Sequence, residues 1–380
     1  MTAPGLFLAR LRLTNFRSWL GLDARFDASL ICIAGENGAG KTNLLEAISL
    51  LAPGRGLRGA RMAECGRQEA GAALPWAVAG RFETRAGPME IGTGTDPEGA
   101  AERRIYRLDG QALRSQATLA DRMAAVWITP QMDRLFQEGA SGRRRFLDRL
   151  VWALEPGHAR EVAAHDNAMA ERNRLLAEGR ADAAWLAGLE DAMSRHAVAV
   201  TAARRALMLR LNAELAAGRA TGAFPAARMD IACPMLTALA DTPALAVEDA
   251  LRAGLAQDRR RDAAAGGAAR GAHKADLVLV HKPKGISAEF CSTGEQKALL
   301  VSVVLAHATL IAEARGFAPL LLLDEVAAHL DPTRREALFA ALAALPAQVF
   351  MTGTDAEVFA PLAGIGQLFG AGDGGLFALG

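Results

Sequence analysis

Cysteine is sparse in this chain, and its four cysteines are far apart: Cys32, Cys65, Cys233 and Cys291. They form no CxxC pair, so the spacing suggests neither a zinc site nor a disulfide framework. Long apolar runs are also missing. The longest candidate, residues 298–311, contains polar side chains and is shorter than a membrane-spanning helix, which predicts a buried helix. With no N-terminal signal-peptide pattern, we expect a soluble, cytoplasmic protein with no membrane partner.

An excess of charge of one sign is missing as well. The 43 Lys and Arg residues balance 42 Asp and Glu residues, and the formal net charge is +1. Bulk electrostatics therefore identifies no partner, and any surface for nucleic acid must be a local patch. Each basic cluster, such as residues 143–145 or 259–261, is most simply a solvated face. Arg55, Arg58 and Arg61 are the candidate DNA-binding residues, because they are basic and follow closely on the motif described next.

Lysine is scarce, and one of the five lysines completes a phosphate-loop motif. Residues 35–42 match the pattern GxxxxGK[ST], between an apolar strand-like run and a helical pattern. Glycines let the backbone approach a phosphate, and the helix N-terminus adds positive partial charge. Lys41 is expected to bind the β- and γ-phosphates and Thr42 to ligate Mg²⁺. The predicted ATP-binding loop consists of Gly35, Glu36, Asn37, Gly38, Ala39, Gly40, Lys41 and Thr42.

A second motif is the apolar run 319–323, which ends in Asp324 and Glu325. In a phosphate-loop ATPase, the acid that ends such a strand holds Mg²⁺. A following glutamate can polarise the attacking water. Taken alone, the run indicates only a buried strand with a capped end. Beside a complete phosphate loop, it predicts Asp324 and Thr42 as metal ligands and Glu325 and Lys41 as catalytic residues.

A third motif, Ser-Thr-Gly-Glu-Gln-Lys at residues 292–297, precedes the apolar stretch 298–311. A hydroxyl, a glycine and a helix N-terminus together form an anion-binding device. The simpler interpretation is a helix cap. Ser292 or Thr293 would then be the N-cap, and the acidic or amide side chain that follows would close a capping box.

The order of these motifs resembles the head of ABC-type ATPases: phosphate loop, helical insertion, Ser-x-Gly-Glu, acidic strand, then Leu330-Asp331. Within that superfamily, nearly the whole chain is similar to the RecF family of bacterial DNA-repair ATPases, which is related to SMC proteins. The phosphate loop is shared with many ATPases. The more specific segments are residues 143–148 and 172–176, supported by residues 13–18, 43–48 and 292–297.

The resemblance implies that ATP is held between two subunits. RecF-like proteins dimerise when ATP binds, with the phosphate loop of one subunit facing the Ser-x-Gly motif of the other. Ser292 and Gly294 would therefore contact the γ-phosphate in trans, and Asp331 would lie at the dimer seam. Gln131 would sense Mg²⁺, although an ordinary loop glutamine is an equally good interpretation. Arg17 would border the nucleotide.

The same resemblance implies a function in recombinational repair and replication restart. The ATP-induced homodimer would clamp double-stranded DNA or single-strand/double-strand junctions, with RecR as partner. Together with RecO it would help to load RecA on gapped DNA, and weak ATP hydrolysis would act as a switch. Two alternatives are another ABC- or SMC-like ATPase, such as a transporter subunit or a structural chromosome protein, and a small-molecule kinase. The sequence lacks a sustained coiled coil and a switch histidine near residues 350–354, where Thr352 is the nearest counterpart.

The expected fold class is α/β. We expect an ABC-type ATPase head, with a phosphate loop and a mixed β-sheet with flanking helices, that carries an inserted α-helical subdomain. The N-terminal part of the head is placed at residues 1–137, the insertion at 138–272 and the C-terminal part at 273–380. One segment departs from the family pattern, since residues 271–276 lack a proline and have Lys274 in place of an arginine. These changes remove a rigid turn and a bidentate donor.

Overall fold

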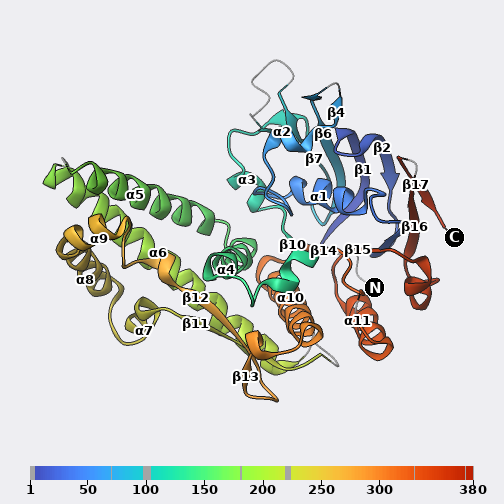
Figure 1. Ribbon diagram of the computed structural model, residues 1–380. Helices are drawn as coiled ribbons and strands as arrows, with labels where there is room; N and C mark the ends of the chain where they lie inside the picture. The colour runs from blue at the N-terminus through green and yellow to red at the C-terminus, as the bar shows by residue number, and fades with distance from the viewer. Residues whose placement is uncertain are drawn as a thin grey trace. The chain divides into compact units, whose positions relative to one another are not determined.

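The computed structural model describes residues 5–69, 71–96, 104–179, 182–218, 224–328, 330–372 and 374–379. The chain forms two compact units, and each is a mixture of helices and strands (Figure 1). Unit 1 comprises Met1–Arg134, Ala217–Ala226 and Ser292–Gly380. Unit 2 comprises Leu135–Ala216 and Ala227–Cys291, so it is inserted into the sequence of unit 1. The α/β class with a largely helical insertion is confirmed.

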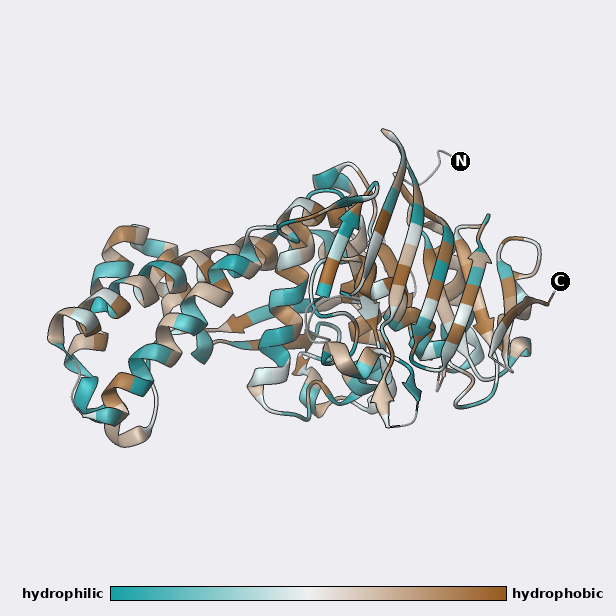
Figure 2. Cartoon of the chain, turned by 90° about the horizontal axis from the view of Figure 1, so that it is seen from above, coloured by the Kyte–Doolittle hydropathy of each residue, from teal (hydrophilic) through white to brown (hydrophobic). Residues whose placement is uncertain are grey.

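The first sheet of unit 1 is antiparallel throughout, and its strands alternate between buried apolar and exposed polar residues. Leu11 and Leu13 on one face are buried, while Arg12 between them is exposed. The same alternation appears as bands of colour along its strands in Figure 2. In spatial order the strands are β2 (Trp19–Arg25), β1 (Leu6–Phe16), β6 (Ala77–Thr84), β7 (Gly87–Thr95), β8 (Arg104–Leu108) and β9 (Gln111–Ala112).

The second sheet of unit 1 is parallel except for its last pair of strands, and it positions the candidate site. In spatial order its strands are β10 (Ala125–Ile128), β14 (Leu320–Leu323), β15 (Val349–Gly353), β3 (Leu30–Ala34), β16 (Gln367–Gly372) and β17 (Gly375–Ala378). Every residue of β3 and β14 is buried. Because parallel strands end at one edge of a sheet, the loops after β3, β14 and β15 meet there. A separate two-stranded hairpin is formed by β4 (Gln68–Glu69) and β5 (Ala72–Ala73).

The 23-residue helix α10 (Thr293–Arg315) of unit 1 is long and apolar enough to cross a membrane by length and composition. Within its most apolar 18-residue stretch, 78% is buried inside the structure, so the prediction of a buried helix is confirmed. Helix α1 (Lys41–Leu51) contacts strands of both large sheets. The remaining helices of this unit are α2 (Met62–Cys65), α3 (Ala117–Ala120), η1 (Pro130–Arg134), α11 (Pro332–Ala344) and η4 (Ala356–Leu362).

Unit 2 combines a helical bundle with a three-stranded antiparallel sheet. The sheet is formed by β11 (Ala227–Ala232), β12 (Asp276–His281) and β13 (Ile286–Ser287). Since β12 pairs with β11, residues 276–291 fold with the insertion. The predicted boundary between residues 272 and 273 therefore differs from the boundary of the compact unit. The helices are α4 (Ala140–Leu154), α5 (His158–Glu178), α6 (Ala183–Ala217), α7 (Pro234–Asp241), α8 (Ala244–Gln257), α9 (Arg259–Ala265), η2 (Ala272–Lys274) and η3 (Ala288–Phe290).

A buried arginine joins four helices of unit 2, of which α5 and α6 run side by side (Figure 1). Arg172 of α5 is 0% exposed, and its guanidinium donates to Glu190 Oε1 of α6 at 3.0 Å and to Asp262 Oδ2 of α9 at 2.9 Å. A third bond runs to the carbonyl of Leu255 at 2.7 Å. Arg259 donates two further bonds to the Glu190 carboxylate. Arg172, the first residue of segment 172–176, therefore stabilises the packing of the helical bundle.

Three arginines of α4 and α6 hold the segment that departs from the family pattern. Arg143 makes a bidentate pair with Asp276, at 2.7 and 2.8 Å. Arg144 donates to the carbonyl of Ala275 at 3.0 Å, and Arg204 donates to the carbonyl of Ala272 at 2.7 Å. Much of the basic cluster 143–145 is thus engaged inside unit 2, and residues 271–276 retain a defined conformation without the proline.

Candidate active site

The phosphate loop connects β3 to α1 through two glycines with left-handed backbone angles. Gly38 has φ 88° and Gly40, the N-cap of α1, has φ 92°. A Cβ atom at Gly40 would lie 2.8 Å from the hydroxyl of Ser18 and 3.1 Å from the ring of Trp19, so only glycine fits. Among the described residues, the N–H groups of Gly38, Gly40, Lys41 and Thr42 have no acceptor. Such donors at the start of a helix form a cradle for an anion.

The ammonium group of Lys41 lies across this cradle. Its Nζ donates to the carbonyl oxygens of Gly35 at 2.6 Å and Glu36 at 2.9 Å. Burial lowers the pKa of Lys41, while the nearby carboxylates of Glu325 and Asp324 act in the opposite direction. The sheet edge therefore brings the predicted phosphate-binding lysine close to both predicted acids. A bound phosphate would offer this ammonium charged acceptors in place of two carbonyls.

The two predicted metal ligands are in contact. Thr42 Oγ1 donates to Asp324 Oδ1 at 3.1 Å, although the residues are 282 positions apart. Thr352, at the end of β15, donates to the same carboxylate oxygen at 2.7 Å. Hydroxyl and carboxylate oxygens are the hard ligands that Mg²⁺ prefers, together with phosphate oxygens and water. The donor set beside the anion cradle therefore fits a magnesium nucleotide.

Glu325 has an unusual backbone. Its φ of 50° lies in the left-handed region, which costs a non-glycine residue about 1–2 kcal/mol. Its N–H donates to Thr352 Oγ1 at 2.9 Å, and its carbonyl accepts a bond from Lys297 Nζ at 3.0 Å. Strained residues of this kind cluster at functional sites. Hydrogen bonds on both sides of the residue therefore hold the predicted catalytic glutamate.

The motif at the start of α10 is a helix cap. Ser292 is the N-cap, its hydroxyl accepts from the N–H of Glu295 at 3.4 Å, and the Glu295 carboxylate accepts from the N–H of Ser292 at 3.0 Å. Asp331 is likewise the N-cap of α11 and accepts from the N–H of Arg334 at 2.9 Å. A Cβ atom at Gly294 would lie 3.6 Å from the guanidinium of Arg334. In the described part of the chain, no hydrogen bond joins Ser292, Gly294 or Asp331 to the phosphate loop of the same subunit.

Gln131 is exposed on η1, the short helix after β10. On the same helix, Asp133 Oδ2 lies 4.0 Å from Lys297 Nζ. Lys297 thus contacts both the η1 segment and the turn after β14. The sequence assigns it no role, but two signals point to it: the scarcity of lysine and its place in the third motif. Thr352, named from the sequence as the nearest counterpart of a switch histidine, lies near the end of a parallel strand beside β14 and contacts Asp324.

Of the candidate DNA-binding arginines, Arg58 is held by a buried carboxylate. Glu46 of α1 is 1% exposed and accepts two bonds from Arg17, at 2.9 and 2.8 Å, and one from Arg58 at 2.9 Å. Arg55 and Arg61 are exposed. The Arg17 guanidinium is therefore directed onto α1 immediately after the phosphate loop.

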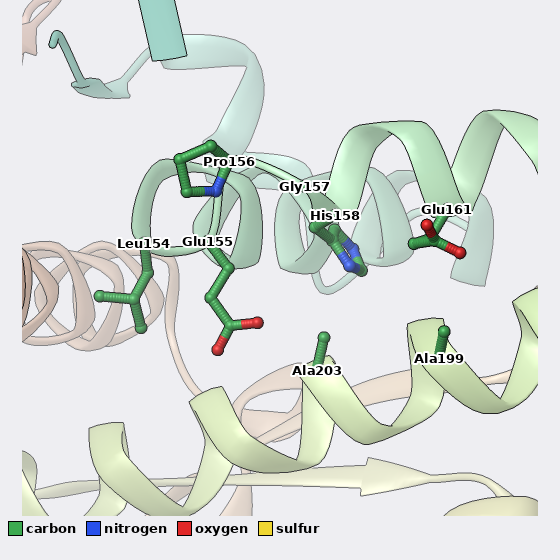
Figure 3. A pocket seen from close by; sticks show the side chains of 8 residues that line it. All are labelled: Leu154, Glu155, Pro156, Gly157, His158, Glu161, Ala199 and Ala203. Carbon is green, nitrogen blue, oxygen red and sulfur yellow. The ribbon is translucent and has the colours of Figure 1, made fainter. Parts of the chain in front are cut away.

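A separate pocket of about 430 Å³ lies within unit 2 (Figure 3). The side chains of Glu155 and His158 point toward the helix that carries Ala199 and Ala203. His158 Nε2 is hydrogen-bonded to Asp148 at 2.8 Å. None of the predicted ATP ligands lines this pocket.

Comparison with protein families gives a match to the RecF/RecN/SMC N-terminal domain over residues 7–370. A DNA replication and repair protein RecF from Allorhizobium ampelinum is 45% identical over 374 residues, which cover 98% of this chain and 99% of that protein. The corresponding protein of Mesorhizobium japonicum is 46% identical and covers 95% and 94% of the two chains.

The fold is also similar to solved structures. The recombination mediator protein RecF, solved with ATPrS, superposes with a TM-score of 0.86 at 21% identity and covers 100% of this chain and 99% of its own. An Smc head domain from Pyrococcus furiosus, bound to the C-terminal domain of ScpA, gives a TM-score of 0.55 at 16% identity and covers 98% and 96%. These likenesses show an ABC-type ATPase fold.

Proposed function

This chain belongs to the RecF family, and we infer that it is an ATP-dependent DNA-binding protein of replication and repair. The observation that carries the proposal is the contact of Thr42 with Asp324 beside the Lys41 cradle. Curated relatives across nearly the full length are named as DNA replication and repair proteins, which supports the same assignment. The chain would act in the cytoplasm within the RecFOR pathway named for the solved RecF structure.

Each site residue has a distinct part in the proposed ATPase reaction. Bound MgATP supplies the phosphoryl group that is transferred to water. The Gly35–Thr42 backbone and Lys41 bind its phosphates, and Thr42 and Asp324 hold the metal. Glu325 orients the attacking water and accepts its proton. Gln131, which lies on η1, would sense whether the metal is bound.

We further propose that the site is completed by a second copy of the chain. Ser292 and Gly294 lie at the N-terminus of a 23-residue helix, and neither is hydrogen-bonded to the phosphate loop of the same subunit within the described residues. A helix N-terminus with an exposed hydroxyl suits a γ-phosphate offered by a partner. Asp331 would lie at the same seam. The ATP-bound dimer would clamp duplex DNA or a single-strand/double-strand junction, bind RecR and, with RecO, assist RecA loading.

Lys41→Ala tests the proposal. Hydrogen bonds to charged groups contribute about 1.5–3 kcal/mol, so ATP affinity should fall roughly 10–100-fold. Light scattering and DNA titration at one stated salt concentration should show that MgATP dimerises the wild-type chain and that only the dimer binds DNA. Lys274→Ala, which removes an exposed lysine of unit 2, is the matched control. Tight DNA binding by Lys41→Ala without ATP would refute the clamp.

Arg55 and Arg61 are proposed as the phosphate-contacting residues of the DNA surface. Replacing each by alanine should weaken binding about equally for different DNA sequences. The slope of the logarithm of the binding constant against the logarithm of salt concentration should fall by about one per residue replaced. Arg85→Ala, an exposed arginine in the turn between β6 and β7, is the control. An unchanged salt slope in the double variant would place the DNA surface elsewhere.

A further inference from the structure

Lys297 is a buried cation in the second turn of α10. Its side chain is 5% exposed, and it precedes an apolar stretch of α10, residues 298–301. Nζ donates to the carbonyl oxygens of Glu325 at 3.0 Å and Ala328 at 2.9 Å, and Asp133 Oδ2 lies 4.0 Å away. Burial lowers the pKa of Lys297, while Asp133 and the two acids of the site oppose that shift. Burying a charge is costly, and these contacts compensate it.

The targets of this ammonium lie in the turn that contains the catalytic glutamate. Glu325 begins the turn, Ala328 closes it through a hydrogen bond from its N–H to the Glu325 carbonyl at 3.1 Å, and Thr352 accepts from the Glu325 N–H. Lys297 and Thr352 therefore hold the two peptide groups that flank the strained Glu325 residue. An apolar side chain at position 297 could fill space there, but it could not satisfy these carbonyls.

We propose that Lys297 is a positioning residue for Glu325 and that it couples the start of α10 to ATP hydrolysis. The proposal rests on the ATPase function proposed above. Lys297 and Thr352 keep the Glu325 backbone left-handed, and this conformation directs the carboxylate. Ser292 caps the same helix and would contact the nucleotide of the partner. A shift of the helix on engagement of that nucleotide would therefore reach Glu325 through Lys297.

Lys297→Met tests the coupling, because methionine keeps a comparable length without the donors. Turnover should fall about 100-fold, as expected for a misplaced catalytic group, while ATP affinity changes less than about threefold. In the nucleotide-free protein, amide exchange of residues 325–328 should accelerate, because the turn loses its restraint. The double variant with Glu325→Gln should be no slower than Glu325→Gln alone, since residues that act as one unit are not additive.

A second pair of variants guards against a general folding defect. Thr352→Val should also accelerate exchange of the Glu325 amide and lower turnover, whereas Thr352→Ser, which keeps the hydroxyl, should restore both. Thr309→Val on α10 is the matched control, because among the described residues its hydroxyl donates within the helix, to Leu305 at 3.3 Å. Normal ATP binding with unchanged turnover and exchange in Lys297→Met would overturn this proposal alone. Absence of ATP binding by the wild-type chain would overturn the proposed function as well.

Discussion

Glu325→Gln is expected to lower ATP turnover by orders of magnitude while ATP binding is retained. The exchange keeps the size and the backbone contacts of the residue and removes only the carboxylate that accepts a proton. Positioned general bases contribute typically 10²–10⁴-fold, so turnover should fall by about that factor. Single-turnover kinetics and ATP titration measure the two effects separately. In light scattering, the MgATP dimer of this variant should persist longer than that of the wild-type chain.

Asp324→Asn is the control that distinguishes loss of the proposed metal site from loss of the proposed general base. Asp324 accepts hydrogen bonds from both Thr42 and Thr352, so its carboxylate belongs to the proposed metal site. Its loss should weaken Mg²⁺ and ATP binding together, which Glu325→Gln should not do. Equal losses of ATP affinity in the two variants would contradict the division of roles between the adjacent acids.

The nucleotide site could be predicted from the sequence because its parts are local motifs at strand ends. The loop after β3 and the acids after β14 each carry a recognisable pattern, and parallel strands bring their carboxyl ends to one edge. The contact of Thr42 with Asp324 follows from that rule. Thr352 obeys the same rule but lacks a pattern of its own, and the role of Lys297 depends on which backbone carbonyls the folded turn exposes.

The interior of unit 2 could not be predicted in this way. Arginines in clusters look like a solvated or DNA-binding face, because a sequence does not show which carboxylates lie opposite them. Arg143 pairs with Asp276, and Arg172 pairs with Asp262, across 133 and 90 residues of chain. The extent of the insertion could not be predicted for the same reason. The pairing of β11 with β12 is non-local, so the composition change near residue 272 did not mark the boundary.

The second large effect is expected for Arg172→Ala, which should lower the free energy of unfolding of unit 2. Removing one partner of a buried ion-pair network leaves uncompensated charge, which typically costs about 3–5 kcal/mol. Glu190 would keep its bonds to Arg259, so the loss falls mainly on Asp262 and on the Leu255 carbonyl. The free energy of unfolding of unit 2, from urea titration with amide exchange on α5 and α6, measures it.

Arg174→Ala on the same helix separates burial from charge. Its side chain is 52% exposed and pairs with Glu171 and Glu178 at the surface, where solvent screens the interaction. The urea midpoint of unit 2 should therefore stay unchanged, although the same charge is removed two residues away. If the two variants shifted the midpoint equally, charge balance along α5, rather than the buried network, would stabilise the bundle. If only Arg172→Ala destabilises unit 2 and ATP affinity is unchanged, Arg172 stabilises the fold of unit 2 and does not take part in nucleotide binding.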